Sequence, residues 1–239
     1  MVGHRREQHG LPLRLRAPAA RGRLRNRRRP TTTSITLARA IDPEGRNLFE
    51  LLGSSADRAR STAAAAGIDI APFAPFEPWF AGLTISEMAL QQHGYDVEHG
   101  VEQVIEAAAS RDDKARCGLE TLDFQLGMLD GMPADLQEEL LLQSLEEASR
   151  VDEVIQPMLA AWRAGDERAL VRSLEDDFEG YPELEEQLIT ARNERWAGLV
   201  GDMLEEDGDI LLVVGALHLV GDRGLPALLR KRGFEVRRH

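Results

Sequence analysis

Apolar residues recur at helical spacing over much of the chain. In residues 135–163, leucine, isoleucine, alanine and tryptophan return every three or four positions, and Gly165 follows this stretch. Residues 183–206 repeat the pattern. Such spacing places the apolar side chains along one side of a helix, so both stretches predict long amphipathic helices. Shorter stretches of the same kind predict helices over Leu83–His93 and Val101–Ala109.

The C-terminal part of the chain has a different pattern. Residues 209–214 (DILLVV) form an apolar run typical of a buried strand, residues 223–232 predict a helix, and residues 234–238 (FEVRR) predict a second strand. Another strand-like piece, Ala115–Leu119, ends at Glu120. Helices that alternate with strands are typical of α/β proteins. We therefore expect a helix-rich α/β fold with a central mixed sheet flanked by helices.

Composition and charge narrow the classes of function. Hydrophobic residues make up 43% of the 239 residues and charged residues 29%, which is typical of a globular protein. The net charge of −12 and the 5% of aromatic residues argue against a nucleic-acid partner. The single cysteine, Cys117, excludes an internal disulfide framework and a cysteine-based zinc site. The longest apolar run, residues 210–220, is well short of the ~20 residues of a transmembrane helix, so we expect no transmembrane segment.

The first 30 residues differ from the rest. They contain ten arginines and one acidic residue, Glu7, so they carry +9, whereas residues 31–239 carry −21. Three interpretations remain open: a basic arm that binds nucleic acid or anionic lipid, a targeting peptide without the apolar core of a secretory signal, or a GC-rich gene read in the wrong frame. We accordingly divide the chain into a basic leader, 1–30, and a domain, 31–239.

His218 and Glu120 are candidate functional residues because each follows a predicted strand. The carboxyl ends of strands are where open α/β sheets place their ligand sites. In the sequence Gly215-Ala-Leu-His218, glycine permits close backbone approach and a neutral imidazole can ligate a metal ion or accept a proton. Glu120 could activate water or bind a metal ion. The alternatives are a hydrogen-bonded core histidine and a glutamate that stabilises a helix N-terminus.

Arg192 is a third candidate, on geometric grounds. If Leu184 is set to zero and each residue advances about 100°, Arg192 falls at about 80°, on the same side as Leu199 and Trp196. A guanidinium cannot lose its proton, so its burial requires a carboxylate or another acceptor. A side chain that reaches out to solvent, or a structural ion pair, is the alternative.

Four segments, in order, resemble the TraB/GumN family, which includes the Tiki-type metalloproteases. Together they cover most of residues 100–236. A Leu-Glu-Thr element lies in residues 100–133, Trp-Arg-x-Gly-Asp in 161–166, Arg-Asn-x-x-Trp in 191–200, and Gly-x-x-His followed by Gly-Leu-x-x-Leu-Leu in 213–236.

The resemblance implies metal-dependent hydrolysis of a peptide or another small substrate. It implies a divalent metal (Mn, Co or Zn) held by His218, with Glu120 as a further ligand or as the acid/base carboxylate, and Arg192 as the residue that stabilises developing charge. Family members are often envelope-associated or secreted, which this chain does not show on its own. The sequence leaves the oligomeric state open.

One departure from the family pattern changes the expectation. The family has a first Gly-x-x-His near its N-terminus, on the opening strand, but no Gly-x-x-His precedes Gly215 here. We therefore expect the first strands of the sheet to be missing and the metal site to be incomplete, because a catalytic metal usually has about three protein ligands. Weak or absent activity is expected. The alternative functions are a non-enzymatic peptide- or metabolite-binding protein that uses the same cleft, and an arginine-arm nucleic-acid binder.

Overall fold

The computed structural model describes residues 14–16, 38–179, 181–206 and 208–238. They form two compact units, and the boundary between them falls after Val154, inside a helix. The first unit holds the described residues from 38 to Val154, and the second holds residues 14–16 together with those from Ile155 onward. Of the predicted leader, residues 1–30, only residues 14–16 are among the described residues, so the prediction stays a prediction.

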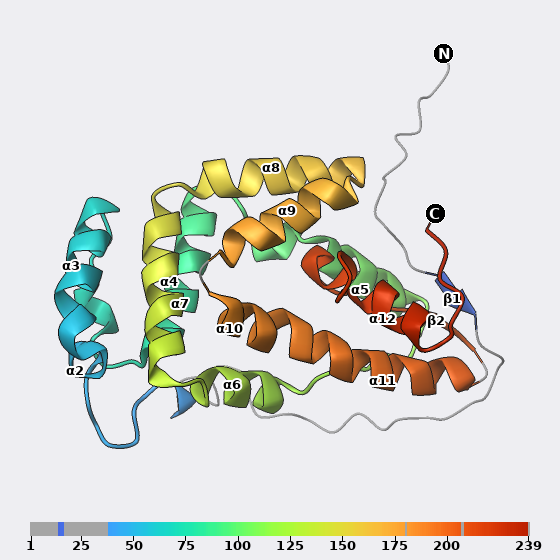
Figure 1. Ribbon diagram of the computed structural model, residues 1–239, viewed down its shortest axis with the longest axis horizontal. Coiled ribbons are helices and arrows are strands. Elements are labelled where there is room, and N and C mark those ends of the chain that lie inside the picture. Colours follow the sequence, from blue (N-terminus) through green and yellow to red (C-terminus); the bar gives the residue numbers. More distant parts are fainter. Residues whose placement is uncertain (1–13, 17–37, 180, 207, 239) are drawn as a thin grey trace, which may run out of the picture. The chain divides into compact units, whose positions relative to one another are not determined.

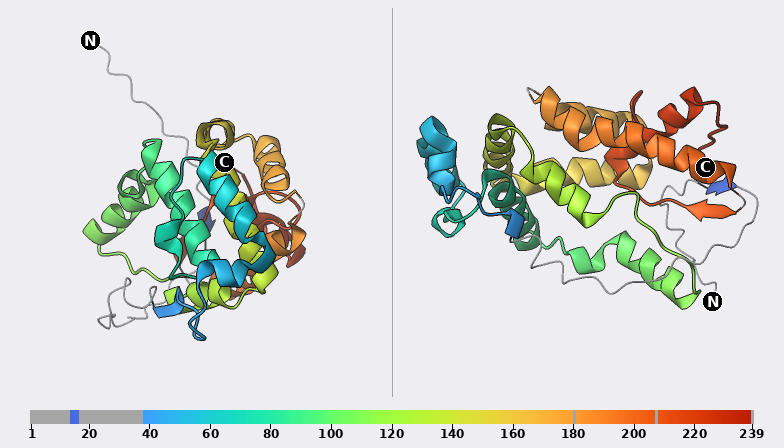
Figure 2. Two further views of the ribbon diagram at one scale, coloured as in Figure 1. Left: turned by 90° about the vertical axis from the view of Figure 1, so that its left-hand side faces the viewer. Right: turned by 90° about the horizontal axis from the view of Figure 1, so that it is seen from below.

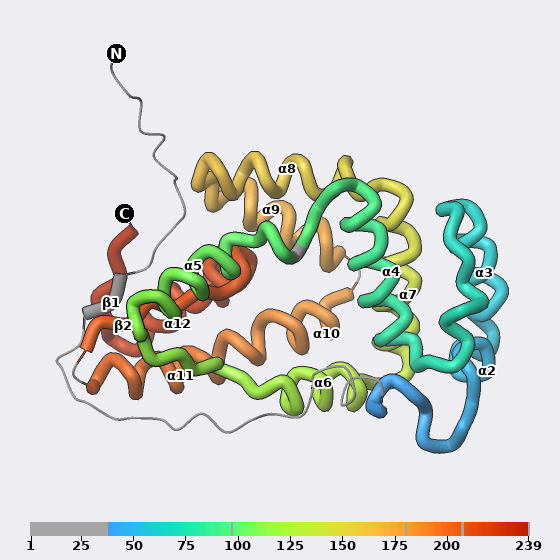
Figure 3. The backbone as a smooth tube through the Cα atoms, turned by 180° about the vertical axis from the view of Figure 1, so that it is seen from behind, coloured from blue at the N-terminus to red at the C-terminus, as the bar shows by residue number. Residues whose placement is uncertain are grey.

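The first unit is a helical assembly built around α4 (Pro78–Gln92) and α7 (Ala134–Ala148), which lie side by side (Figures 1 and 3). The fully buried Leu141 and Leu145 of α7 belong to its core, together with Leu48. The remaining helices of the unit are α2 (Leu48–Leu52), α3 (Ala56–Ala65), α5 (Val101–Arg111) and α6 (Leu122–Asp130), with short turns η1 (Gly53–Ser55), η2 (Ala71–Phe73) and η3 (Val97–His99).

Local sequence explains where several of these helices begin. The Asn47 side chain accepts hydrogen bonds from the backbone at the start of α2, and the Glu50 carboxylate accepts one from the Asn47 backbone N–H, which is a capping box. Pro78 opens α4, where its missing N–H costs nothing. Thr121 caps α6 by accepting from the Phe124 backbone. These three helix starts are therefore encoded by a residue suited to satisfy, or to lack, an unpaired backbone donor.

The second unit is also mainly helical, and its core cluster contains Ala161, Leu170 and Val220, with Trp162 packed against it. The boundary between the units falls within α8 (Val151–Ala164). The helical ribbon continues from α10 through α11 (Figure 1). The elements of this part are α8, α9 (Glu167–Asp177), α10 (Pro182–Glu185), the π-helical turn η4 (Glu186–Thr190), α11 (Ala191–Glu205), β2 (Asp209–Leu211), the 3₁₀ turn η5 (Ala216–Leu219), α12 (Leu225–Lys231) and β1 (Arg14–Arg16).

The expected central mixed sheet is wrong for the part of the chain that the structure describes. The only sheet found there is an antiparallel pair of three-residue strands, β1 and β2, drawn as the blue and orange arrows in Figure 2. In this pair Leu15 lies opposite Ile210. Residues 115–119 and 234–238 form no strand. A strand requires a neighbour to pair its backbone groups, which an apolar run by itself does not supply. Residues 115–118 are moreover exposed, so that segment has no buried face.

The helix predictions agree with the structure more closely than the sheet prediction does. The helix predicted over Val101–Ala109 is confirmed and extends to Arg111, and α4 begins earlier than the predicted Leu83, at Pro78. The single helix predicted over 135–163 is two helices, because α7 ends at Ala148 and α8 begins at Val151. No described helix combines the length and apolar character that crossing a bilayer requires.

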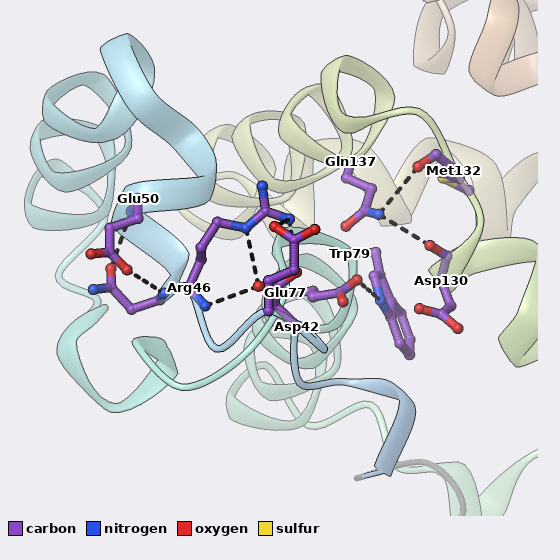
Figure 4. A network of polar contacts seen from close by, with 10 residues as sticks. Asp42, Arg46, Glu50, Glu77, Trp79, Asp130, Met132 and Gln137 are labelled. Carbon is purple, nitrogen blue, oxygen red and sulfur yellow. Dashed lines mark hydrogen bonds and ion pairs between the residues drawn. The ribbon is translucent and has the colours of Figure 1, made fainter.

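A buried acidic residue, Asp42, is neutralised locally by Arg46 (Figure 4). The Arg46 guanidinium donates from Nη2 to Asp42 Oδ1 at 2.9 Å and from Nε to Oδ2 at 3.1 Å, and the Arg46 backbone also donates to Oδ2. These hydrogen bonds lower the pKa of Asp42. The turn before α2 is therefore closed by a charged pair with both carboxylate oxygens engaged.

Glu77, in contrast, is a buried carboxylate whose charge is less well compensated. It is 6% exposed and accepts a hydrogen bond from Trp79 Nε1 at 3.1 Å (Figure 4). Burial raises the pKa of Glu77, and the negative charges of Asp130 and Asp42 raise it further. Its backbone N–H donates to the Ala40 carbonyl at 2.7 Å, which ties the start of α4 to the N-terminal end of the unit.

We expect Glu77→Gln to raise the melting temperature at neutral pH. Because the pKa of Glu77 is raised in the folded state, its contribution to stability is full below the unfolded pKa and is lost as the pH rises through the folded value. A neutral glutamine keeps an acceptor for Trp79 without the buried charge. The gain should therefore shrink toward pH 4, as thermal unfolding over a pH series would show. The exposed Glu87→Gln on the same helix serves as control, and an equal gain at every pH would contradict the explanation.

At Gly82, α4 and α7 pack so closely that there is little room for a side chain. A Cβ at this position would lie 3.1 Å from Leu141 Cα and 3.3 Å from the Leu140 carbonyl. We expect Gly82→Ala to force the two helices apart and to lower the free energy of unfolding by about 1–3 kcal/mol. In Gly127→Ala the new methyl meets only the end of the Arg39 side chain at 3.6 Å, so helix propensity should make it neutral or stabilising by up to ~1 kcal/mol. Urea denaturation of both variants distinguishes the two effects.

A histidine–asparagine–tryptophan site in the second unit

The turn η5 and the helix α11 bring together two of the segments singled out in the sequence. His218, on η5, is buried, and its Nδ1 lies 2.8 Å from Oδ1 of Asn193 on α11. Asn193 is fully buried, and its Nδ2 donates to the Arg223 carbonyl at 2.9 Å. The Gly-x-x-His and Arg-Asn-x-x-Trp segments thus meet through one hydrogen-bonded amide.

The direction of the Asn193 amide determines which nitrogen of His218 carries a proton. Because Nδ2 of Asn193 is the donor to the Arg223 carbonyl, Oδ1 is the atom that faces His218. An amide oxygen only accepts, so Nδ1 of His218 must be the donor. In the neutral imidazole, Nε2 then carries the lone pair. This is the tautomer in which Nε2 can accept a proton or ligate a metal ion.

Trp196 packs against the same imidazole and connects it to Arg192. The ring centroids of Trp196 and His218 are 4.5 Å apart, with the planes inclined at 46°. The guanidinium carbon of Arg192 lies 4.8 Å from the centroid of the Trp196 ring, which is a cation–π contact. Arg192 Nη1 also donates to the Leu188 carbonyl at 3.0 Å. Arg192 and His218 are therefore two neighbours of one indole.

Arg223, in the loop after η5, forms ion pairs with η4 and α11. Its guanidinium contacts Glu186 Oε2 at 2.7 Å and Glu194 Oε1 at 3.4 Å. These acceptors raise the pKa of Arg223. Because the Arg223 backbone carbonyl accepts a hydrogen bond from Asn193, the ion pairs and the buried amide hold the same segment against α11.

The π-helical turn η4 explains why Asn193, rather than Arg192, is central to the buried face. A π turn holds one extra residue compared with an α-helical turn, so it rotates every later side chain relative to an uninterrupted helix. The buried positions of α11 are Asn193, Trp196, Ala197, Val200 and Gly201. Arg192 is only partly buried, and Leu199 is 37% exposed. The prediction of a helix over 183–206 is confirmed as a helical run, but its predicted buried face is off by about one residue.

Glu120 belongs to the first unit and does not end a strand. It lies just before Thr121, the N-cap of α6, and its Oε2 accepts from Gln125 Nε2 at 3.1 Å. Its side chain is partly buried. Because Glu120 and His218 belong to different units, the prediction that they meet stays a prediction.

Comparison with known proteins identifies the family. The sequence model of the TraB/PrgY/gumN family matches residues 23–238. The chain belongs to this family. It is also similar to two curated proteins named "Uncharacterized protein YbaP", from Escherichia coli (strain K12) and Shigella flexneri, each 27% identical over 164 residues. The alignment covers 69% of this chain but 60% of each relative, so the chain spans less than two thirds of their length. No solved structure matches the chain significantly.

Membership in the TraB/PrgY/gumN family raises the question of whether these residues fit a divalent metal. A catalytic metal usually needs about three protein ligands. Among the residues that the structure describes, no three His, Cys, Asp or Glu side chains lie close enough to hold one. His218 is suited to ligation through Nε2, but the described residues around it do not by themselves form a metal site.

Asn193 is the residue of this TraB/PrgY/gumN site that sequence reasoning missed. It stands in the segment Ala191–Val200 that resembles the family, and its spacing of three residues from Trp196 places both on one side of a helix. That spacing could have singled it out. A buried asparagine is informative because all of its donors and acceptors need partners.

We expect Asn193→Ala to change the tautomer of His218 as well as to reduce stability. The substitution removes the acceptor for Nδ1–H and leaves the Arg223 carbonyl without its donor, which should cost about 1–3 kcal/mol. ¹⁵N NMR of histidine-labelled protein should show Nδ1 protonated at His218 in the native chain and a shift toward the other tautomer in the variant. His218→Ala assigns the signal among the six histidines. A native spectrum with Nδ1 unprotonated would contradict this arrangement.

Proposed function

We propose that this TraB/PrgY/gumN protein is built on the plan of a metal-dependent peptide hydrolase, with His218 as one metal ligand. Glu120 is proposed as the carboxylate that acts as ligand or acid/base group, and Arg192 as the residue that stabilises developing negative charge. The observation that carries the proposal is the Asn193–His218 contact. A ligating histidine in metalloenzymes typically donates its other ring N–H to an oxygen acceptor, as Nδ1 of His218 does here.

The proposal includes weak or absent hydrolysis by the 239-residue chain. The sequence holds one Gly-x-x-His of the two that the family resemblance implies, and the described residues do not assemble three ligands. We therefore assign no catalytic step to a metal ion. The chain's own residues hold the imidazole in place. Asn193 orients it, Trp196 packs against it, and the Arg192 guanidinium lies over the Trp196 ring.

A second function has a specific observation in its favour. Because the described residues bring together no three-ligand cluster, the same surface could serve a non-enzymatic protein that binds a peptide or a metabolite. In that case His218 acts as a hydrogen-bonding group, and binding of that molecule does not require a metal.

Metal titration distinguishes the two functions. In calorimetry of the purified full chain with Mn²⁺, Co²⁺ or Zn²⁺, stoichiometric binding that is lost in His218→Ala would support the hydrolase plan. The exposed His99, which pairs with Asp96, offers a matched control, and His99→Ala should bind as the native chain does. Absence of binding by every metal would favour the binding protein over the hydrolase.

Hydrolysis of a peptide library by the full chain is expected to stay at the background rate, with or without the metal that binds most tightly. Mass spectrometry of the products measures it directly. Cleavage above background that disappears in His218→Ala would overturn the prediction of weak activity and would show that the ligand set is complete.

A further inference from the structure

A groove of about 600 Å³ lies on the second unit, between the start of α9 and the C-terminal segment. It is lined by Arg238 on one side and, on the other, by Gly165, Asp166, Glu167, Arg168, Val171 and Arg172. The volume is within the range of small-molecule sites. α9 also packs against η5, the turn that carries His218, so the groove adjoins the site described above.

The Trp-Arg-x-Gly-Asp segment builds one wall of this groove, and each of three residues has a defined role. Trp162 packs against the core cluster of the second unit. Gly165 has a φ of +64°, a left-handed conformation that favours glycine, and it reverses the chain between α8 and α9. Asp166 caps α9 by accepting from the Ala169 backbone at 3.0 Å. The proposed hydrolase chemistry uses none of these residues.

The charges that line the groove do not cancel. Glu167 is paired with Arg238 at 3.4 Å, Arg238 also donates to the Gly165 carbonyl, and an oxygen of Asp166 is engaged in the cap. The other two charged residues of the lining are Arg168 and Arg172. Neither forms a hydrogen bond or ion pair with any residue that the structure describes, and both are exposed. Four positions apart on one helix, they present two adjacent guanidinium groups to the groove.

From this geometry we propose that the groove is an oxyanion-binding site, in which Arg168 and Arg172 take a carboxylate or a phosphate group. Guanidinium groups bind such anions with paired, charge-assisted hydrogen bonds. Val171 also lines the groove and adds an apolar surface next to the arginines, so we expect the anionic group to belong to a larger molecule with an apolar part. Because the chain carries −12 overall, attraction toward anions is local to this groove. The site does not depend on a metal at His218.

NMR titration of the full chain tests the proposal with three probes: inorganic phosphate, a dipeptide with a free C-terminal carboxylate, and the same dipeptide with an amidated C-terminus. Saturable shifts of the amides of residues 165–172 are expected with at least one anionic probe and not with the amide. A response to phosphate alone identifies a phosphate site, and a response to the free dipeptide alone identifies a carboxylate site.

Variants show whether the arginines carry the binding. The double variant Arg168→Gln/Arg172→Gln should raise the dissociation constant for the anionic probe about tenfold or more, since each charge-assisted hydrogen bond contributes strongly to the free energy of binding. Arg163→Gln, at an exposed arginine of α8 outside the groove lining, should leave the dissociation constant unchanged. All substituted positions are exposed, so thermal unfolding should match that of the native chain. No saturable shift with either anion, or equal binding by the double variant, would overturn the proposal.

Discussion

The second unit depends on one buried amide. Asn193 cannot be buried unless its donor and acceptor are both satisfied, and the chain satisfies them with the Arg223 carbonyl on one side and His218 on the other. That requirement brings the loop after β2 onto α11 and orients the imidazole in the same step. The ion pairs of Arg223 with Glu186 and Glu194 support the arrangement from outside, where solvent weakens each pair.

A single irregular turn decides which side chain occupies that position. The π turn Glu186–Thr190 rotates the following helix so that Asn193 and Trp196 face the core and Arg192 lies beside them. It also buries Thr190, whose hydroxyl has no hydrogen-bond partner among the described residues. Such π turns often occur at functional sites. The irregular turn therefore leads directly into the helix that carries the buried asparagine and the tryptophan in contact with His218.

The groove at α9 and the histidine site differ in the interactions that define them. At His218 a buried hydrogen bond with an asparagine sets the orientation of one ring, whereas at Arg168 and Arg172 exposed positive charges lie without partners in the described structure. The contact of α9 with η5 makes them neighbours. The prediction that Glu120 joins His218 and Arg192 remains a prediction, because Glu120 belongs to the other unit.

The sequence by itself determined the local features: the helices over 101–109, 183–206 and 223–232, the segments that identify the family, and His218 and Arg192 as residues of interest. These follow from helical periodicity and from short motifs, which depend on neighbours along the chain. Only the tertiary structure decided that the apolar runs do not assemble a central sheet, that 135–163 breaks after Ala148, and that Asn193 is the partner of His218. Strand pairing, the phase of a helix after a π turn and the satisfaction of a buried amide all depend on residues far apart in sequence, whose packing no local pattern contains.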